Sequence, residues 1–285
     1  MLRTGLALAL VAVAGLSACN GSEADRPADR DHYVAIGDSY TAAPLIGSTD
    51  SNDGCLRSRT NYPHLVAEAE GFELDDVSCS GAGTDAVRNE QHTKQTILPP
   101  QLDAVDEGTD LVTIGLGFND FGLTLITFLT CPKVAERNAK GAPCTAADEA
   151  AGAAGVDGSL RRLDKRIAKA VRAVREKAPD AQVMVIGYPE VFPAKRACDN
   201  YPVADGDLPL VRKIIRGINK AAEAAAERHD ATFIDVYGPS RGHDLCSEDP
   251  WFAGNEADPD RKGLIWHPYA EEQELVAELV REQLD

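Results

Sequence analysis

Short apolar runs alternate with longer amphipathic stretches along most of the chain. Five runs are rich in Val, Ile, Leu or Phe and end in turn-forming residues, as buried strands do. These runs are Tyr33–Ile36, Phe72–Ser78, Leu111–Gly115, Ala181–Gly187 and Ala231–Asp235. Apolar residues recur every third or fourth position at 160–174 and 211–222, which predicts helices between the last three strands, and a further helix is expected at 270–284.

Strands that are separated by helices of this length imply right-handed crossovers. We therefore expect an α/β fold, a three-layer α/β/α flavodoxin-like sandwich around a mainly parallel five-stranded sheet. Residues 31–285 are expected to form one catalytic domain, because α/β enzymes of this length often have a single core.

The first residues have the pattern of an export signal. An apolar run from Leu6 to Leu16 is too short to span a bilayer comfortably, so we expect a signal peptide at 1–18. Leu16–Cys19 resembles a bacterial lipobox, in which the Cys thiol carries the lipid, although ordinary cleavage beside an incidental Cys is the alternative. Lipidated Cys19 and a polar tether would then occupy 19–30. The protein is expected in the cell envelope, lipid-anchored on the outer face of the membrane, or secreted.

Seven cysteines are present, and six remain when Cys19, the expected site of lipidation, is set aside. Six cysteines in an oxidising compartment predict three disulfides, for which 15 connectivities are possible. A zinc site is not expected, because no Cys-x-x-Cys or His-x-x-x-His spacing occurs. The net charge of −17 would repel phosphate backbones, so nucleic acid is not an expected partner.

Candidate chemistry follows the first three strands, because ligands of such sheets gather at the carboxyl ends of strands. Ser39 lies on a tight turn after the first strand, where a nucleophile would be exposed and its own amide would support an oxyanion. Gly81 follows the second strand and allows a backbone N–H to face the same point, and Asn119 follows the third with a side-chain donor. Taken singly, each residue could equally be a helix cap or a turn residue.

A histidine with the setting of a general base stands just before the last helix. His267 lies between Trp266 and Pro268, and Pro268 suits the first turn of the helix. Histidine is the side chain best suited to take a hydroxyl proton near neutral pH.

A glycine pattern offers a competing interpretation. Gly81–Ala86 fits the dinucleotide pattern G-x-G-x-x-A. That pattern requires the first strand of a βαβ unit and an acid at the end of the next, whereas here it follows the second strand, and the third ends in glycines. Nucleotide binding is therefore not favoured.

The order of these residues resembles that of the SGNH/GDSL hydrolases. Ser39, Gly81, Asn119 and His267 match the four residues that name this superfamily, and the match runs from about Tyr33 to the last helix. The resemblance implies the SGNH hydrolase fold, a Ser39 nucleophile, a His267 base and an oxyanion hole formed by the Ser39 and Gly81 amides and the Asn119 side chain. It implies no metal and no organic cofactor.

A closer resemblance is to the three-disulfide secreted lipases, esterases and phospholipases. It rests on residues around the cysteines and on Gly187–Pro189. In that branch the bridges join neighbours in sequence, which implies Cys55–Cys79, Cys131–Cys144 and Cys198–Cys246.

One position departs from the superfamily pattern. The Asp that often stands three residues before the catalytic His is Leu264 here. The resemblance therefore implies a Ser–His dyad in which the backbone carbonyl of Leu264 orients His267, with Asp244 or Asp249 folding back onto His267 as the alternative.

The expected activity is hydrolysis of carboxylic esters, by a monomer. An apolar run after Asn119 could wall an acyl groove or pack in the core: Phe121, Leu123, Leu125, Ile126, Phe128 and Leu129. A phospholipase, a carbohydrate acetyl esterase and a non-catalytic binding lipoprotein are the alternatives.

Overall fold

The computed structural model describes residues 31–256 and 258–284. The expected signal peptide, lipidated Cys19 and tether fall on residues 1–30 and so lie outside the described residues.

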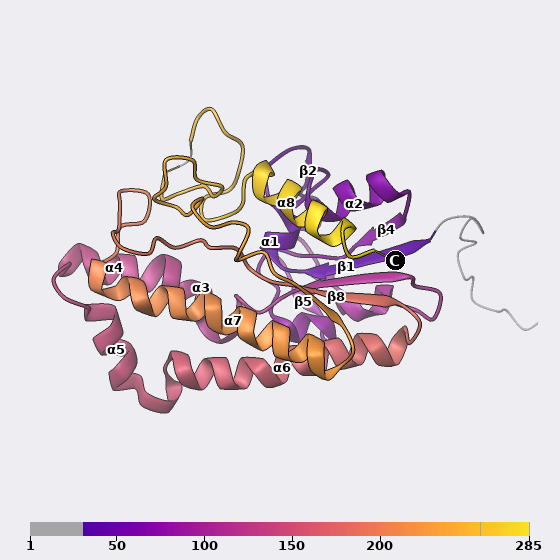
Figure 1. Ribbon diagram of the computed structural model, residues 1–285, viewed down its shortest axis with the longest axis horizontal. Coiled ribbons are helices and arrows are strands. Elements are labelled where there is room, and N and C mark those ends of the chain that lie inside the picture. The colour runs from indigo at the N-terminus through magenta and orange to yellow at the C-terminus, as the bar shows by residue number, and fades with distance from the viewer. Residues whose placement is uncertain (1–30, 257, 285) are drawn as a thin grey trace, which may run out of the picture.

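A five-stranded sheet forms the centre of the molecule (Figure 1). Its order is β4-β1-β7-β8-β9, and every neighbouring pair is parallel, which confirms the expected fold class. The strands are β1 (His32–Gly37), β4 (Glu73–Asp76), β7 (Leu111–Gly115), β8 (Gln182–Ile186) and β9 (Thr232–Ile234). All five expected strands are present, the second and the last two being shorter than their apolar runs.

Two short hairpins and a series of helices connect these strands. The antiparallel pairs are β2 (Thr49–Asp50) with β3 (Arg57–Ser58) and β5 (Gln91–His92) with β6 (Ile97–Leu98). The α-helices are α1 (Ser39–Ala42), α2 (Tyr62–Glu70), α3 (Leu123–Leu125), α4 (Cys131–Arg137), α5 (Pro143–Ala151), α6 (Val156–Lys177), α7 (Leu208–Arg228) and α8 (Ala270–Arg281). One π-helical turn, η4 (Ile126–Thr130), joins α3 to α4.

Alternate side chains of the strands enter two separate cores. Val34 and Ile36 of β1 pack in the core beneath α6 and α7, whereas Tyr33 and Ala35 pack in the core beneath α2 and α8. Figure 1 shows α6 and α7 on one face of the sheet and α2 and α8 on the other. The sheet and both cores lie within the described residues, and the single catalytic domain expected at 31–285 stays a prediction.

Helix α6 has an unusual charge. It carries eight Lys and Arg residues and three acidic ones, although the chain as a whole has 29 basic and 46 acidic residues. The exposed surface of this helix is therefore basic in an otherwise acidic protein.

None of the described helices is both long enough and apolar enough to span a membrane.

Candidate active site

The turn between β1 and α1 presents Ser39. Asp38 caps α1 by accepting a hydrogen bond from the Tyr40 N–H (2.8 Å), and Ser39 is the first residue of the helix. A Cβ on Gly37 would lie 2.2 Å from Thr41 Oγ1, so only glycine fits this tight turn. Ser39 is 8% exposed, and its N–H, at the start of the helix, has no acceptor in the described part of the chain.

Asp38 is held in the interior beside this serine. Tyr188 Oη donates to Asp38 Oδ2 at 2.6 Å, and the carboxyl is fully buried. Burial raises the pKa of Asp38 to about 7. The hydrogen bond from Tyr188 to Asp38 thus holds the turn that carries Ser39 in place.

His267 lies in a second tight turn, on the loop before α8. Its backbone N–H donates to the Leu264 carbonyl (3.0 Å), and its Nδ1 lies 2.8 Å from the Ile265 carbonyl. The prediction that the Leu264 carbonyl orients the imidazole ring is therefore wrong, because the Ile265 carbonyl occupies that position. Trp266 adopts a φ of 67°, which closes the turn so that the Leu264 carbonyl meets the backbone and the Ile265 carbonyl meets the ring.

The two carboxylates that were alternative partners of His267 face other groups. Asp249 lies against His243 Nδ1 (3.2 Å), and Asp244 Oδ1 accepts from the Cys246 N–H (2.8 Å). Burial lowers the pKa of His267 to about 4, against the smaller opposing effect of the Ile265 carbonyl. The imidazole is therefore neutral at pH 7, with Nδ1–H directed to Ile265 and Nε2 free to act as a base.

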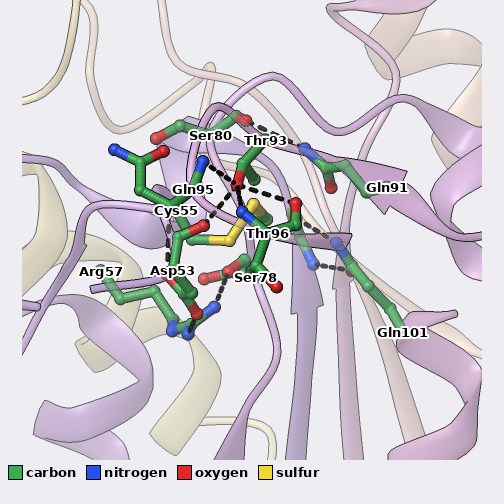
Figure 2. Close-up of a disulfide and its surroundings, with 12 residues drawn as sticks. Asp53, Cys55, Arg57, Ser78, Ser80, Gln91, Thr93, Gln95, Thr96 and Gln101 are labelled. Atoms are coloured by element: carbon green, nitrogen blue, oxygen red, sulfur yellow. Dashed lines mark hydrogen bonds and ion pairs between the residues drawn. A yellow bond between two sulfur atoms is a disulfide. The ribbon is translucent and has the colours of Figure 1, made fainter. Parts of the chain in front are cut away.

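Gly81 lies in the turn after β4. Its φ is +83°, a conformation that favours glycine, and no atom lies within 4 Å of the place where a Cβ would point. Within the described residues its N–H has no acceptor. The turn is held beside the Cys55–Cys79 disulfide, where the Ser80 N–H donates to the Cys55 carbonyl and Gln91 Nε2 donates to the Ser80 carbonyl (Figure 2).

Asn119 connects this turn to the end of β7. One Nδ2 hydrogen is donated to the Ala82 carbonyl at 3.0 Å, and Oδ1 accepts from Thr124 Oγ1 at 3.0 Å. These two bonds fix the amide orientation and leave the second Nδ2 hydrogen for another acceptor.

Asp120 ties the same two segments together a second time. Its carboxylate accepts from both the N–H and the Oγ1 of Thr84, at 2.8 and 2.6 Å. Arg166 Nη1 lies 3.0 Å from Asp120 Oδ1, and the Arg166 guanidinium stacks on the Phe121 ring. The sequence places Asp120 next to Asn119, but a lone Asp gives no signal of the three bonds that its carboxylate accepts in the fold.

A cavity of about 150 Å³ brings the candidate groups together. It is lined by Asp38, Ser39, Tyr40, Phe118, Asn119, Thr124, Leu125, Phe128, Leu129, Trp266 and His267. Ser39, Asn119 and His267 thus share one site, while Gly81 lies outside the lining and is linked to it through the bond from Asn119 to Ala82. A larger open hollow of about 1040 Å³ beside Cys198 has neither serine nor histidine in its walls.

The apolar run after Asn119 divides between the two roles expected of it. Leu125, Phe128 and Leu129 line the cavity, whereas Leu123 is fully buried in the core. Phe121 instead packs under Arg162 and Arg166, and Ile126 packs against the core. The described residues contain no group of three His, Cys, Asp or Glu side chains arranged to hold a metal ion.

All three disulfides join the pairs that the resemblance implies. They are Cys55–Cys79, Cys131–Cys144 and Cys198–Cys246. Each bridge lies in segments that follow the carboxyl ends of strands, which is the end of the sheet that carries the cavity.

Comparison with known proteins gives a consistent assignment. The sequence model of the GDSL-like Lipase/Acylhydrolase family matches residues 35–274. The chain is 37% identical to Lipase 2 of Streptomyces coelicolor over 219 residues, which cover 75% of this chain and 72% of the relative. It is 34% identical to Lipase 1 of the same organism over 247 residues, which cover 86% and 84%.

Solved structures share the fold over nearly the whole length. The extracellular lipase of Streptomyces rimosus superimposes with a TM-score of 0.73 at 28% identity, covering 89% of this chain and all of that one. Phospholipase A1 of Streptomyces albidoflavus NA297 superimposes with a TM-score of 0.72 at 27% identity, covering 90% of this chain and all of that one.

Proposed function

The chain belongs to the GDSL-like lipase/acylhydrolase family and is a carboxylic ester hydrolase, and on that premise we propose that Ser39 and His267 form its catalytic dyad. The observation that carries the proposal is the shared cavity, which holds a serine at a helix start and a neutral histidine whose Nδ1 faces a carbonyl.

The first chemical step follows from the state of His267. Because burial keeps the imidazole neutral, Nε2 accepts the Ser39 hydroxyl proton as Oγ attacks the ester carbonyl carbon. The Ile265 carbonyl accepts from Nδ1–H and holds the ring in this tautomer. His267 then returns the proton to the leaving alcohol, and water releases the acyl group by the same route.

Three donors are available for the oxyanion. The Ser39 and Gly81 N–H groups have no acceptor in the described structure, and Asn119 has one Nδ2 hydrogen to give. Removing one such donor typically lowers kcat by about 100- to 1,000-fold. Asn119→Ala should therefore lower kcat while leaving the fold intact.

The cavity walls support an acyl substrate. Leu125, Phe128, Leu129 and Trp266 present apolar surface beside Ser39. A cavity of about 150 Å³ holds a molecule about the size of benzene, so this one encloses only the first carbons of an acyl chain. A triglyceride and a phospholipid present the same ester and acyl group to such walls, so phospholipase action is the second candidate activity.

For location, we propose export with a lipid anchor at Cys19. The three disulfides support an oxidising compartment, and the sequence pattern of residues 1–19 supports the anchor.

The test is hydrolysis of p-nitrophenyl esters from acetate to palmitate by protein from Asp31 onward. Ser39→Ala and His267→Gln should abolish hydrolysis. His243→Gln is the matched control, because His243 lies in the same loop but stacks on Trp251 outside the cavity. A folded, oxidised protein that is inert on every ester would overturn the catalytic proposal in favour of a binding lipoprotein.

A further inference from the structure

Of the exposed large hydrophobic side chains in the described residues, two line the cavity and two more lie on the segments beside His267. In the described part of the chain, the exposed large hydrophobic residues are Leu45, Ile97, Leu125, Leu129 and Ile265. Leu125 and Leu129 are each 57% exposed and also line the cavity. They are four residues apart on consecutive helical turns, so both project from the same side of the α3–η4 segment.

Leu45 and Ile265 lie on the histidine side of the site. The Leu264 N–H donates to the Pro44 carbonyl at 3.1 Å, which joins the residue before Ile265 to the residue before Leu45. Ile265 is two residues from His267 and supplies the carbonyl that faces its ring. These four residues, Leu45, Leu125, Leu129 and Ile265, are here called the apolar rim.

Apolar surface of this kind is costly to leave in water, and a cluster of it marks a contact surface. Two members of the rim continue into the walls of the cavity, so the exposed surface and the enclosed acyl site are one continuous apolar face. Because the cavity encloses only the start of an acyl chain, the remaining carbons must lie across Leu125 and Leu129 or stay within a lipid layer.

We propose that the apolar rim docks the mouth of the cavity onto an uncharged lipid surface, so that the enzyme takes its ester from aggregated lipid rather than from dissolved monomers. The net charge of −17 disfavours an anionic layer, which leaves neutral or zwitterionic lipid as the partner. This proposal deepens the function proposed above, but docking itself requires no catalysis.

The experiment measures binding of Ser39→Ala protein, from Asp31 onward, to phosphatidylcholine vesicles by co-sedimentation. The serine variant leaves the lipid intact, so the result is independent of whether Ser39 is the nucleophile. Leu45→Gln, Leu125→Gln and Leu129→Gln in this background should each lower the partition coefficient by about 3- to 10-fold, the effect of withdrawing part of one leucine from lipid.

Ile97→Gln is the matched control. Ile97 is 55% exposed, as much as Leu125, but it lies on the β5–β6 hairpin and does not line the cavity. Its replacement should leave vesicle binding unchanged. Equal losses for Ile97→Gln and the rim variants, or no binding at any lipid concentration, would overturn the proposal. Self-association that Leu125→Gln abolishes, without vesicle binding, would assign the rim to a second copy of the chain instead.

A kinetic measurement provides the second readout. Leu45 does not line the cavity, so Leu45→Gln in the otherwise native protein should leave hydrolysis of dissolved p-nitrophenyl butyrate unchanged and slow hydrolysis of emulsified tributyrin about 3- to 10-fold. An equal loss on both substrates would contradict docking and indicate damage to the site.

Discussion

Asp120 takes no part in the proposed chemistry, yet it accepts two bonds from Thr84 and one from Arg166 beside the proposed oxyanion donors. Asp120→Asn replaces one acceptor oxygen by a donor that faces Arg166 or Thr84. We expect kcat to fall about 10- to 100-fold with KM nearly unchanged, because a small displacement of Gly81 and Asn119 weakens transition-state binding. Steady-state kinetics on p-nitrophenyl butyrate measures this split.

Asp207 provides the control for that variant. It is fully buried and accepts from the N–H and Oγ1 of Thr145, as Asp120 does from Thr84, but it lies outside the cavity. Asp207→Asn should lower the melting temperature without changing kcat. Equal kcat losses in the two variants would show that Asp120 acts only through stability.

We expect the pKa of His267, the proposed base, to set the acid limit of activity. The active form is the neutral imidazole, which is present above a pKa of about 4 and is lost as the pH falls through it. We expect kcat/KM to be flat from pH 7 down to about pH 5 and then to fall about tenfold per pH unit. A pH–rate profile, with fluorescence to verify folding at each pH, measures the limb. A limb near pH 7 would instead indicate control by Asp38.

The raised pKa of Asp38 makes the stability of the fold depend on pH between about 4 and 7. Its pKa is about 7 in the folded protein and 3.8 ordinarily, so the folded chain retains a proton that the unfolded chain releases between these values. The contribution of Asp38 to the free energy of unfolding therefore falls as the pH rises through this window and is constant above it. In Asp38→Asn this contribution is absent, so the difference in stability between variant and wild type should change from pH 4 to 7. Urea unfolding at several pH values tests this, and a constant difference would be inconsistent with the raised pKa.

Part of the candidate site could be predicted at this scale, because Ser39, Gly81 and Asn119 follow strand ends and His267 precedes the last helix. Ser39, Asn119 and His267 line one cavity, and their catalytic roles stay predictions. The orienting carbonyl could not be predicted, because it depends on the positive φ of Trp266, and tryptophan gives no sequence signal for that conformation.

At the scale of elements, short apolar runs predicted all five sheet strands and helical periodicity predicted α6 and α7, since each has an apolar face that only packing can satisfy. A helix was also expected where α8 lies. It could not predict η4 or the exposure of Leu125 and Leu129. An apolar run predicts burial by composition, whereas exposure here arises from where η4 meets the cavity.

Two of the disulfides lie beside different parts of the cavity, so we expect their removal to change different kinetic constants. By the loop-closure estimate, losing Cys55–Cys79 or Cys131–Cys144 costs roughly the same, about 3 kcal/mol. Cys55–Cys79 adjoins the Gly81 turn, whereas Cys131–Cys144 follows the η4 turn that carries Leu129. Replacing the first pair by Ser should lower kcat, and replacing the second should raise KM for long acyl esters. Identical kinetic effects of the two replacements would contradict this division.

At the scale of the whole molecule, the net charge of −17 opposes compaction. Salt screens this repulsion, so the melting temperature at pH 7 should rise by a few degrees between about 10 and 150 mM NaCl. At pH 4.7, near the isoelectric point, the net charge is close to zero and the rise should vanish. Differential scanning calorimetry at both pH values measures it, and an equal rise at both would exclude repulsion as the cause.

All three disulfides lie in segments at the carboxyl ends of the strands, and this position has a consequence for how the protein folds. Cys55, Cys79, Cys131 and Cys144 pack in the core beneath α6 and α7, but none of the three bridges joins two strands of the sheet, so we expect the sheet to assemble while every thiol is reduced. We expect the turns around the cavity to reach their final positions when the thiols are oxidised. We therefore expect the newly made chain, while its thiols are reduced, to be less harmful to the lipids of the cell that produces it than the oxidised enzyme would be.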